Sequence, residues 1–534
     1  MRRQPSTLLS RLARYARYAA AALAFAAMTV GTPAVAQFGG GGGGGLGGGG
    51  GGGLGGGGGG LGGGGGGLGG GGGGLGGGGG GGLGGGGGGG LGGGGGGATG
   101  GGGVGSGVVV NADGVLRRFA INDPNGVVLE QRAAAATDRL AGDLKQPSKL
   151  RKVSLTRLED AIADRLAAGE APTDAMHRLA GLTRIDYVFC YPETGEVVLA
   201  GPAEPWFDDG AGRVVGVKTG SPIVELQDLV TAMRAYAPAA EAGATPTEPL
   251  IYCSIDPTEE GLADMQRFLV NFGRQATPAD TGYIVSQLRE KLGLQQVTVG
   301  GVPADTHFAQ VLVEADYRMK LIGIGLEEPL APIKNYVSRV SPRRAPRNAL
   351  VRWFFVPDYE RLRLSDDGLA MEIVGEGVRL VGEDEMVTQQ GERRRTGATN
   401  AASRGFVTDF TRRYADLARV SPVYAQLRNC IDLAVVAACM RQNDFYGKAA
   451  WDAPVLMDET KYPVRTYNAP ERVASAVNSL WKGSTLMTPI GGGVMIRPTA
   501  SLDPENVAAD DEGKLAASHA ETTPTADAGV WWWD

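Results

Sequence analysis

Apolar positions between residues 104 and 340 switch repeatedly between strand-like and helix-like spacing. Runs rich in valine, isoleucine and aromatic residues predict two hairpins, one at 108–121 turning at Asp113-Gly114 and one at 185–200 turning at 192–195. A continuous apolar run at 250–255 predicts a buried strand. Segments with helical spacing separate these strands, so this part of the chain predicts a mixed strand–helix domain.

Two of the helical segments carry specific signals. The sequence Thr156-x-x-Glu159 is a capping box at the start of one predicted helix. Its apolar face would consist of Leu155, Leu158, Ile162 and Leu166. The longer helix predicted at 305–322 contains the i,i+4 pairs Glu314/Arg318 and Asp316/Lys320.

A proline- and arginine-rich stretch at 341–347 predicts a boundary, beyond which the pattern changes. Residues 350–381 predict a strand meander that turns at 366–368, and two helices follow. The first helix has large apolar side chains on one face: Phe406, Phe410, Tyr414 and Leu417. Ser421-Pro422 predicts the start of the second helix, whose broad apolar face indicates a core helix rather than a membrane span.

Residues 39–97 contain 52 glycines, interrupted only by leucines every seven or eight positions. A helix there would cost about 6 kcal/mol per heptad relative to alanine, whereas burying one leucine returns about 1.5–3 kcal/mol. The tract therefore predicts a disordered spacer. Weak self-association of the leucines in a cell-envelope matrix is the alternative interpretation.

The first 36 residues have the three parts of a secretory signal. Five arginines precede an apolar stretch at 19–30, and Ala34-Val35-Ala36 is a small-x-small cleavage site. The stretch is shorter than the ~20 residues of a membrane-spanning helix. We therefore expect cleavage after Ala36 and an exported protein that is periplasmic, on the cell surface or extracellular, with no transmembrane segment after cleavage.

Removing the signal takes away five arginines and changes the formal net charge from −6 to −11. An acidic chain is a poor candidate for binding nucleic acid, which requires a basic face. The one arginine run, Arg393-Arg394-Arg395, lies in a polar stretch and indicates a solvated loop.

Residues 500–534 are rich in acidic residues, alanine and threonine, and they lack helical or strand periodicity. This composition predicts a disordered tail. It ends with Trp531, Trp532, Trp533 and Asp534, and exposed tryptophans are costly to leave in water. Two interpretations stay open: an interaction segment for an envelope partner, or a tail that folds back onto its own domain.

The four cysteines, Cys190, Cys253, Cys430 and Cys439, lie in apolar surroundings. Buried free thiols are favoured, and a Cys190–Cys253 disulfide stays open because an exported chain can form disulfides. With three histidines and no Cys-x-x-Cys, no metal site is expected. The chain also lacks G-x-S-x-G, H-E-x-x-H and G-x-x-x-x-G-K-[ST] motifs, so it predicts no cofactor.

The segment 200–210 is the strongest candidate for chemistry, because three carboxylates, Glu204, Asp208 and Asp209, flank Trp206. Paired carboxylates beside an aromatic platform are typical of glycoside hydrolysis. Prolines, glycines and capping aspartates are equally typical of a surface loop, and we favour the loop. His307, two residues after the expected cap Asp305, is a second candidate, for which a hydrogen-bonded histidine at a helix start is favoured over a general base.

Four unusual phrases indicate a family: residues 200–206, 253–258, 315–320 and 353–359. They resemble an uncharacterised family of exported planctomycete proteins, domain of unknown function 1598, and the resemblance would extend over about 108–496. It implies a cell-envelope setting in a planctomycete. It carries over no catalytic or binding residue.

Taken together, the sequence predicts an α/β (or α+β) body of two subdomains between two disordered segments. The expected parts are the signal peptide 1–36, the Gly/Leu linker 37–103, an α/β domain 104–340, a meander-plus-helices domain 341–499 and the acidic tail 500–534. We expect a structural or interaction role in the envelope, with an envelope protein or polysaccharide as partner. A hydrolase of envelope glycans or peptides and a small-ligand-binding protein are the alternatives.

Overall fold

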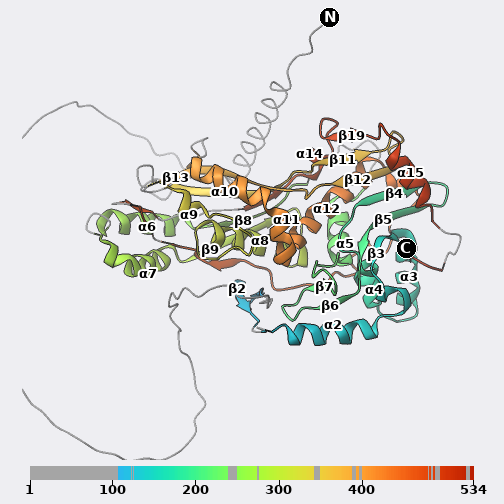
Figure 1. Ribbon diagram of the computed structural model, residues 1–534, viewed down its shortest axis with the longest axis horizontal. Coiled ribbons are helices and arrows are strands. Elements are labelled where there is room, and N and C mark those ends of the chain that lie inside the picture. Colours follow the sequence, from blue (N-terminus) through green and yellow to red (C-terminus); the bar gives the residue numbers. More distant parts are fainter. Residues whose placement is uncertain are drawn as a thin grey trace, which may run out of the picture. The chain divides into compact units, whose positions relative to one another are not determined.

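The described residues all belong to one compact unit. The computed structural model (Figure 1) describes residues 106–121, 123, 125–238, 249–272, 276–341, 349–387, 393–395, 400–478, 480–482, 485–487, 493–524 and 529–534. The predicted signal peptide, the glycine tract and all but Ser341 of the predicted boundary stretch lie outside the described residues.

The larger sheet has nine strands in the order β1-β2-β15-β9-β8-β18-β10-β13-β14. Its pairs are antiparallel except β15 with β2 and β10 with β18, which are parallel. The strands are β1 Ser106–Val110, β2 Val115–Ala120, β15 Arg472–Ala474, β9 Leu294–Gly300, β8 Ile251–Asp256, β18 Gly493–Ile496, β10 Ala349–Pro357, β13 Val378–Val387 and β14 Arg393–Arg395.

The second sheet has seven strands in the order β19-β11-β12-β4-β5-β3-β20, with β11 and β19 parallel and the other pairs antiparallel. They are β19 Val507–Ala509, β11 Arg361–Leu364, β12 Ala370–Val374, β4 Tyr187–Tyr191, β5 Glu196–Ala203, β3 Ser148–Ser154 and β20 Trp532–Trp533. Two short hairpins complete the strands: β6 Trp206–Asp208 with β7 Val214–Gly216, and β16 Leu480–Lys482 with β17 Thr485–Met487.

Helices lie between and beside the two sheets (Figure 1). They are α2 Val127–Arg139, α3 Leu155–Ala167, α4 Asp174–His177, α5 Leu226–Ala235, α6 Glu259–Phe272, α7 Thr281–Leu292, α8 His307–Gly323, α9 Tyr336–Arg339, α10 Ala401–Arg412, α11 Tyr414–Val420, α12 Pro422–Gln442, α13 Phe445–Lys448, α14 Pro498–Ser501 and α15 Lys514–Glu521. The mixed α/β fold class predicted from the sequence is confirmed.

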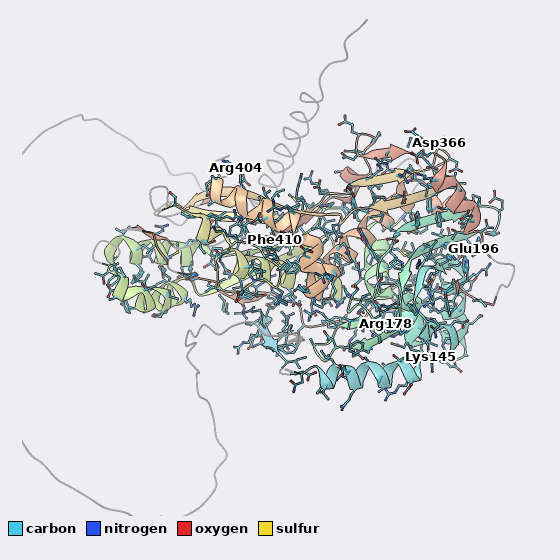
Figure 2. All side chains as sticks on the ribbon, viewed as in Figure 1. Lys145, Arg178, Glu196, Asp366, Arg404 and Phe410 are labelled. Atoms are coloured by element: carbon cyan, nitrogen blue, oxygen red, sulfur yellow. The ribbon has the colours of Figure 1, made fainter. Side chains whose placement is uncertain are left out.

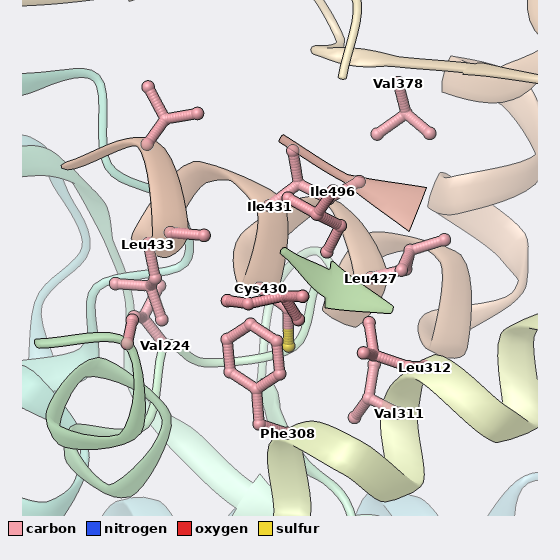
Figure 3. Packing of buried hydrophobic residues seen from close by; sticks show 14 of the residues in the cluster. Val224, Phe308, Val311, Leu312, Val378, Leu427, Cys430, Ile431, Leu433 and Ile496 are labelled. Carbon is pink, nitrogen blue, oxygen red and sulfur yellow. The ribbon is translucent and has the colours of Figure 1, made fainter. Parts of the chain in front are cut away.

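The centre of the core is the contact between α12 and α8. Helix α12 packs on α5, α8 and α11, and α8 packs on β8, β18 and β10. Figure 3 shows apolar side chains of both helices side by side, among them Cys430 and Phe308. By length and composition α12 could cross a membrane, but 94% of its apolar window is buried inside this unit. The prediction of a core helix is therefore confirmed.

Most predicted elements are present, with shifted ends. Both hairpins and the strand at 251–256 form as expected. The predicted meander is wrong: its four strands form, but β10 and β13 pair in the larger sheet, whereas β11 and β12 pair in the second. The expected capping box is wrong: α3 begins two residues earlier, and the cap is Ser154, whose hydroxyl accepts from Arg157 N at 3.3 Å. The carboxylate of Glu159 instead accepts from Val455 N and Leu456 N. A capping box needs its carboxylate at the helix start, and here a tertiary contact takes that carboxylate away.

All four cysteines are buried free thiols, as favoured from the sequence. Cys190 lies on β4 in the second sheet and Cys253 on β8 in the larger one, so no disulfide joins them.

The prediction of a disordered tail at 500–534 is wrong for its described residues. Helix α15 packs on the second sheet through buried Leu515, and β20 extends that sheet next to β3. The fold-back alternative is the one observed. Local composition could not show this, because partners of the tail such as Arg151 and Tyr191 lie more than 300 residues away in the sequence.

Strands from both sides of residue 341 share each sheet. In the larger sheet β18 lies between β8 and β10, and in the second sheet β12 pairs with β4. The two predicted domains, 104–340 and 341–499, are thus joined by main-chain hydrogen bonds in both sheets.

Candidate functional site

A polar cavity of about 660 Å³ lies among the starts of several elements. Its walls come from β1, the end of α4, the β6–β7 loop, the first turns of α5 and α8, one turn of α12, and the irregular segment 462–468. The polar and charged lining residues are His177, Arg178, Asp208, Arg213, Glu225, Gln227, His307, Gln310, Glu314, Gln426, Arg465, Tyr467 and Asn468, with Tyr462 beside them. Arg178 is labelled in Figure 2.

Two helix starts fix the centre of this cavity. Helix α8 begins at His307 because the Thr306 hydroxyl accepts from Ala309 N at 3.2 Å and ends the preceding loop. Helix α5 begins after Glu225 and carries Asp228 in its first turn. Carboxylates in a first helical turn are stabilised by the free N–H groups there. The two helices are in contact, so the two first turns meet.

His307 and Asp228 form a hydrogen-bonded ion pair at this meeting point. His307 Nδ1 lies 2.8 Å from Asp228 Oδ2, and both side chains are largely buried. On its other side, His307 Nε2 lies 3.4 Å from the Gln426 amide nitrogen. The carboxylate therefore orients the imidazole and leaves Nε2 on the cavity side of the ring.

The electrostatics of the pair favour a protonated imidazole at neutral pH. Burial lowers the pKa of His307, but the carboxylates of Asp228 and Glu225 outweigh burial and raise the pKa to about 9. Protonation places an N–H on Nε2, and the Gln426 amide nitrogen cannot accept it. A ligand oxygen in the cavity could.

His177 has the opposite tendency. Burial and the nearby Arg178 guanidinium lower the pKa of His177. Its Nδ1 lies 3.2 Å from the Tyr462 hydroxyl, which can donate to the neutral ring. The cavity thus contains one imidazole held charged and one held neutral.

Two arginines cross-link the walls. Arg178 Nη1 lies 2.9 Å from Glu225 Oε2, so α4 is tied to the start of α5. Arg213 Nη2 lies 2.5 Å from Glu314 Oε1, and Arg213 Nε donates to Gln426 Oε1 at 3.0 Å, which ties the β6–β7 loop to α8 and α12. All these side chains are buried or nearly so, and such charged groups persist in low dielectric only when paired.

Two buried hydrogen-bond acceptors at the start of α5 lack a donor among the described residues. Within the described residues, Gln227 Oε1 and Asp228 Oδ1 are buried and have no hydrogen-bond partner. Leaving a buried acceptor unsatisfied costs about 1–3 kcal/mol. Such groups in a native protein call for an explanation, and a donor from a bound molecule or water supplies one.

The three carboxylates of the cluster predicted in segment 200–210 have different surroundings and different hydrogen-bond partners. Glu204 is 4% exposed, and its Oε2 accepts from Lys218 N at 2.7 Å and Thr219 N at 3.0 Å. Asp209 Oδ1 accepts from Ala211 N at 2.7 Å and Arg213 N at 3.0 Å. Both carboxylates bond local backbone amides, as expected for a loop, but both are buried, so the expectation of surface residues is wrong.

Trp206 and Asp208 occupy different environments as well. Trp206 is 4% exposed and donates from Nε1 to Asp174 Oδ2 at 2.7 Å, so its indole is not an open platform. Asp208 is exposed and lines the cavity. Of the three carboxylates, only Asp208 shares the cavity with His307.

Trp531, Trp532 and Trp533 are not among the residues that line the cavity; they lie beside β3 in the second sheet, and each is half-buried.

Sequence reasoning found His307 but missed the groups that give it a function. Glu225 and Asp228 are acidic residues at the start of an ordinary amphipathic helix, where acids commonly offset the helix dipole. Arg213 and Gln426 have no local signal, and Arg178 has one local partner, Asp174, four residues earlier. The partners that tie these three residues into the cavity wall are between 47 and 213 residues away along the chain, so only the fold brings them together.

Residues 253–336 match the model of a family described as Protein of unknown function (DUF1598). The match confirms the domain of unknown function indicated by the sequence phrases, and it includes two of them, 253–258 and 315–320. It spans β8 except for its first residues, then α6, α7, β9 and α8, and it ends at the first residue of α9. His307, Gln310 and Glu314 of the cavity therefore belong to the matched segment. Comparisons with curated proteins and with solved structures gave no match.

The chemistry available in the cavity is hydrogen bonding and proton transfer. Among the described residues, no group of histidine, cysteine, aspartate and glutamate side chains is arranged to hold a metal ion. A His–Asp pair can act as an acid or base when its free ring nitrogen faces a substrate. No serine, threonine or cysteine lines the cavity within the described residues, so the pair has no nucleophile to activate there.

Proposed function

We propose that this protein binds a small, uncharged, hydroxyl-rich ligand of sugar size in the cavity next to His307. The observation that carries the proposal is a buried acceptor without a partner, Gln227 Oε1, on a residue that lines the cavity. Acceptors select a ligand that donates hydrogen bonds. The cavity volume of about 660 Å³ lies within the usual range for small-molecule sites.

The charges of the lining support an uncharged ligand. The cationic groups Arg178, Arg213 and His307 are each paired with a carboxylate of the same wall. Arg465 stacks on Tyr467, 5.1 Å from the ring centroid, and Asp208 adds one negative charge. The balance leaves no strong net charge for a ligand to neutralise, while planar amides and hydroxyls remain to bond it.

Titration with sugars tests this proposal. The probes are glucose, N-acetylglucosamine and its β-1,4-linked dimer, with sulfate as an anionic control, observed by saturation-transfer NMR and calorimetry on the mature chain. We expect millimolar or tighter binding of a sugar that is weakened at least about 10-fold in Gln227→Leu, the loss of about one hydrogen bond. Gln287→Leu, a half-buried glutamine on α7 outside the cavity, is the matched control and should bind as the unaltered protein does. Tight binding of sulfate with no sugar binding would contradict the proposal.

Hydrolysis of the bound sugar is a second candidate, favoured by the His307–Asp228 pair rather than by the predicted carboxylates. The carboxylates of Glu204 and Asp209 already accept hydrogen bonds from backbone amides. A protonated His307 could donate a proton from Nε2 to a leaving oxygen. Turnover of the N-acetylglucosamine dimer that disappears in His307→Gln, with binding retained, would establish this activity, and its absence would leave binding alone.

We also propose that the protein acts outside the cytoplasm, in the cell envelope, with an envelope protein or polysaccharide as its partner. The support is the sequence of residues 1–36 and the glycine spacer after it. Mass spectrometry of the native protein should find a mature chain that starts at Gln37. An intact Met1 or a cytoplasmic fraction would contradict export.

A further inference from the structure

Residues 529–534 extend the second sheet beside β3. In the antiparallel pair, Trp532 lies opposite Val153 and Trp533 opposite Lys152. Ser154 N donates to Trp531 O at 2.9 Å, and the Arg157 guanidinium donates to Val530 O at 3.1 Å. The end of the chain marked in Figure 1 lies beside β3 and α3. Without this segment, β3 would be an open sheet edge.

Arg151 on β3 is the charged centre of this contact. Its side chain is 0% exposed, and it donates from Nη1 to Ala180 O at 2.8 Å and from Nη2 to Gln146 O at 3.2 Å. The Asp534 carboxylate receives a bidentate pair of hydrogen bonds, Nε to Oδ1 and Nη2 to Oδ2, both at 2.8 Å. A fork of this kind is geometrically specific. The Trp532 ring lies 4.7 Å from the guanidinium carbon as well.

The two sides of the contact are built differently. Arg151 is fully buried and held by main-chain carbonyls of the body. The segment that meets it is less buried: the three tryptophans are half-buried, although they pack against the core, and the Asp534 side chain is 41% exposed. A buried cation such as Arg151 requires a counter-charge. The segment that supplies the counter-charge forms a strand of only two residues. Arg151 is thus part of a binding site on the body, and the segment occupies this site as a peptide ligand would.

The chain before the segment is anchored independently. Tyr191 donates from its hydroxyl to His519 O at 2.8 Å, and the Tyr191 and His519 rings stack at 4.4 Å. Leu515 is buried in the cluster around Phe189. Helix α15 therefore has contacts of its own with the sheet, in addition to the cluster that it shares with Trp533.

We propose that the β3 edge with Arg151 is a recognition site for an extended aromatic–acidic peptide. Residues 529–534 occupy it in the same chain, and the same segment of a second copy of the protein can replace them. Strand addition of this kind gains affinity from main-chain hydrogen bonds and specificity from the side chains. Exchange between copies makes the same contacts twice, which is why swapping of terminal elements is a low-cost route to dimers.

Concentration decides which occupant prevails. A short tether gives the segment of the same chain an effective concentration in the millimolar range. Free protein at micromolar concentration therefore binds its own segment, and exchange becomes common only where copies are crowded together. We propose a second copy as the other occupant, because its segment has the same sequence as the segment that occupies the site in this structure.

The first experiment tests the site with a free peptide. A protease site placed between Pro524 and Gly529 lets the full chain fold before cleavage, so folding does not depend on a truncated variant. A fluorescent peptide with the sequence of residues 529–534 and an amidated end is then titrated. We expect the cleaved protein, freed of its segment by gel filtration, to bind the peptide at least about 100-fold more tightly than the uncleaved protein. A cleaved segment that never exchanges, or an emptied site that does not bind the peptide, would overturn the proposal.

Matched variants separate specific recognition from general stickiness of the tryptophans. A peptide with asparagine in place of Asp534, and the protein variant Arg151→Lys, should each weaken binding at least about 10-fold, because both remove the bidentate fork. Arg165→Lys on α3 is the control and should bind as the unaltered protein does. Equal binding of both peptides would show adhesion of the indoles alone and would contradict the assigned role of Arg151.

The second experiment tests the second copy. Analytical ultracentrifugation of the mature chain should show a dimer whose fraction rises with concentration and which is absent when residues 529–534 are deleted. A dimer that persists in the deletion variant, or no dimer up to about 1 mM, would contradict exchange between copies while leaving the peptide site to the first experiment.

Discussion

The surroundings of the two cavity histidines determine the pH at which each of them titrates. His307 and His177 line one cavity, yet their surroundings shift their pKa values in opposite directions. The difference comes from the nearest charges, which are Asp228 and Glu225 for His307 and Arg178 for His177. The chain contains only three histidines, so each ring can be observed separately.

A histidine titration followed by ¹⁵N NMR should therefore give two distinct results. His307 should titrate near pH 9 and His177 below its usual range near 6.5. In Asp228→Asn the pKa of His307 should fall, because burial is then opposed by Glu225 without the closer carboxylate. A value for His307 that does not change in this variant would show that Asp228 is not its partner.

The same pair gives stability a pH dependence of known sign. Because the folded-state pKa of His307 is raised above its unfolded value, the pair contributes fully below about pH 6.5 for as long as Asp228 is ionised. That contribution is lost as the pH rises through about 9. Burial raises the pKa of Asp228, so the contribution is lost again in acid. Urea unfolding at pH 6 and pH 10 should show the loss, and Asp228→Asn should reduce the difference.

At the ends of some elements, a single buried carboxylate accepts several backbone hydrogen bonds and so fixes the turn. The β6–β7 hairpin closes over Glu204, which bonds two amides of the turn after β7. Gly216 on β7 leaves the room for this side chain, since a Cβ there would lie 2.2 Å from the Glu204 carboxyl carbon. The segment 200–210 thus uses its acids to build a loop that carries Arg213 into the cavity wall.

Removing Glu204 should therefore destabilise the protein, while removing its neighbour should not. Glu204→Ala leaves two amides and a hydroxyl without their acceptor, and we expect a loss of about 2–3 kcal/mol in the free energy of unfolding. Asp208→Ala, an exposed carboxylate, should change it by less than about 0.5 kcal/mol. Denaturant unfolding decides this, and similar effects of the two variants would count against the assigned role of Glu204.

The strand β20 should leave the sheet in acid. Partial burial raises the pKa of Asp534, but the hydrogen bonds from Arg151 and Ser148 and the positive charges of Arg151 and Lys152 outweigh it, so the net pKa is lowered. A lowered carboxyl pKa stabilises docking above the unfolded value near 3.9 and loses that contribution as the pH falls through the folded one.

The tryptophan emission of the protein should report this release as a red shift below about pH 4. Asp534→Asn should already show the red-shifted emission at neutral pH and should lack the acid transition. An unchanged emission in this variant would mean that the carboxylate does not hold the strand.

Across the whole molecule, long-range pairing rather than chain order defines the body. Each sheet takes strands from both halves of the sequence, and the last strand of the second sheet comes from residues 532–533. The described body is therefore tied together over its full length. The glycine tract before it offers no side chains except its leucines for such pairing.

Deleting residues 38–103 should therefore leave the melting temperature of the body within about 2 °C. The physical reason is that glycine-rich sequence forms neither stable helices nor strands and buries little apolar area. Differential scanning calorimetry of the mature chain and the deletion variant gives the comparison. A drop of many degrees would mean that the leucines pack on the body.

The sequence by itself determined the elements whose signals are local. Alternating apolar runs marked the hairpins β1–β2 and β4–β5, and Pro422 marked the start of α12, because turn residues and side-chain periodicity act within a few residues. The same reasoning failed where a distant partner changes the outcome: Glu159 bonds residues 455 and 456 instead of a helix start, and the tail is ordered by Arg151 and Tyr191. The candidate site was decided by tertiary structure for that reason. His307 is visible in the sequence, but its pairing with Asp228, 79 residues away, depends on two helix starts meeting in the fold.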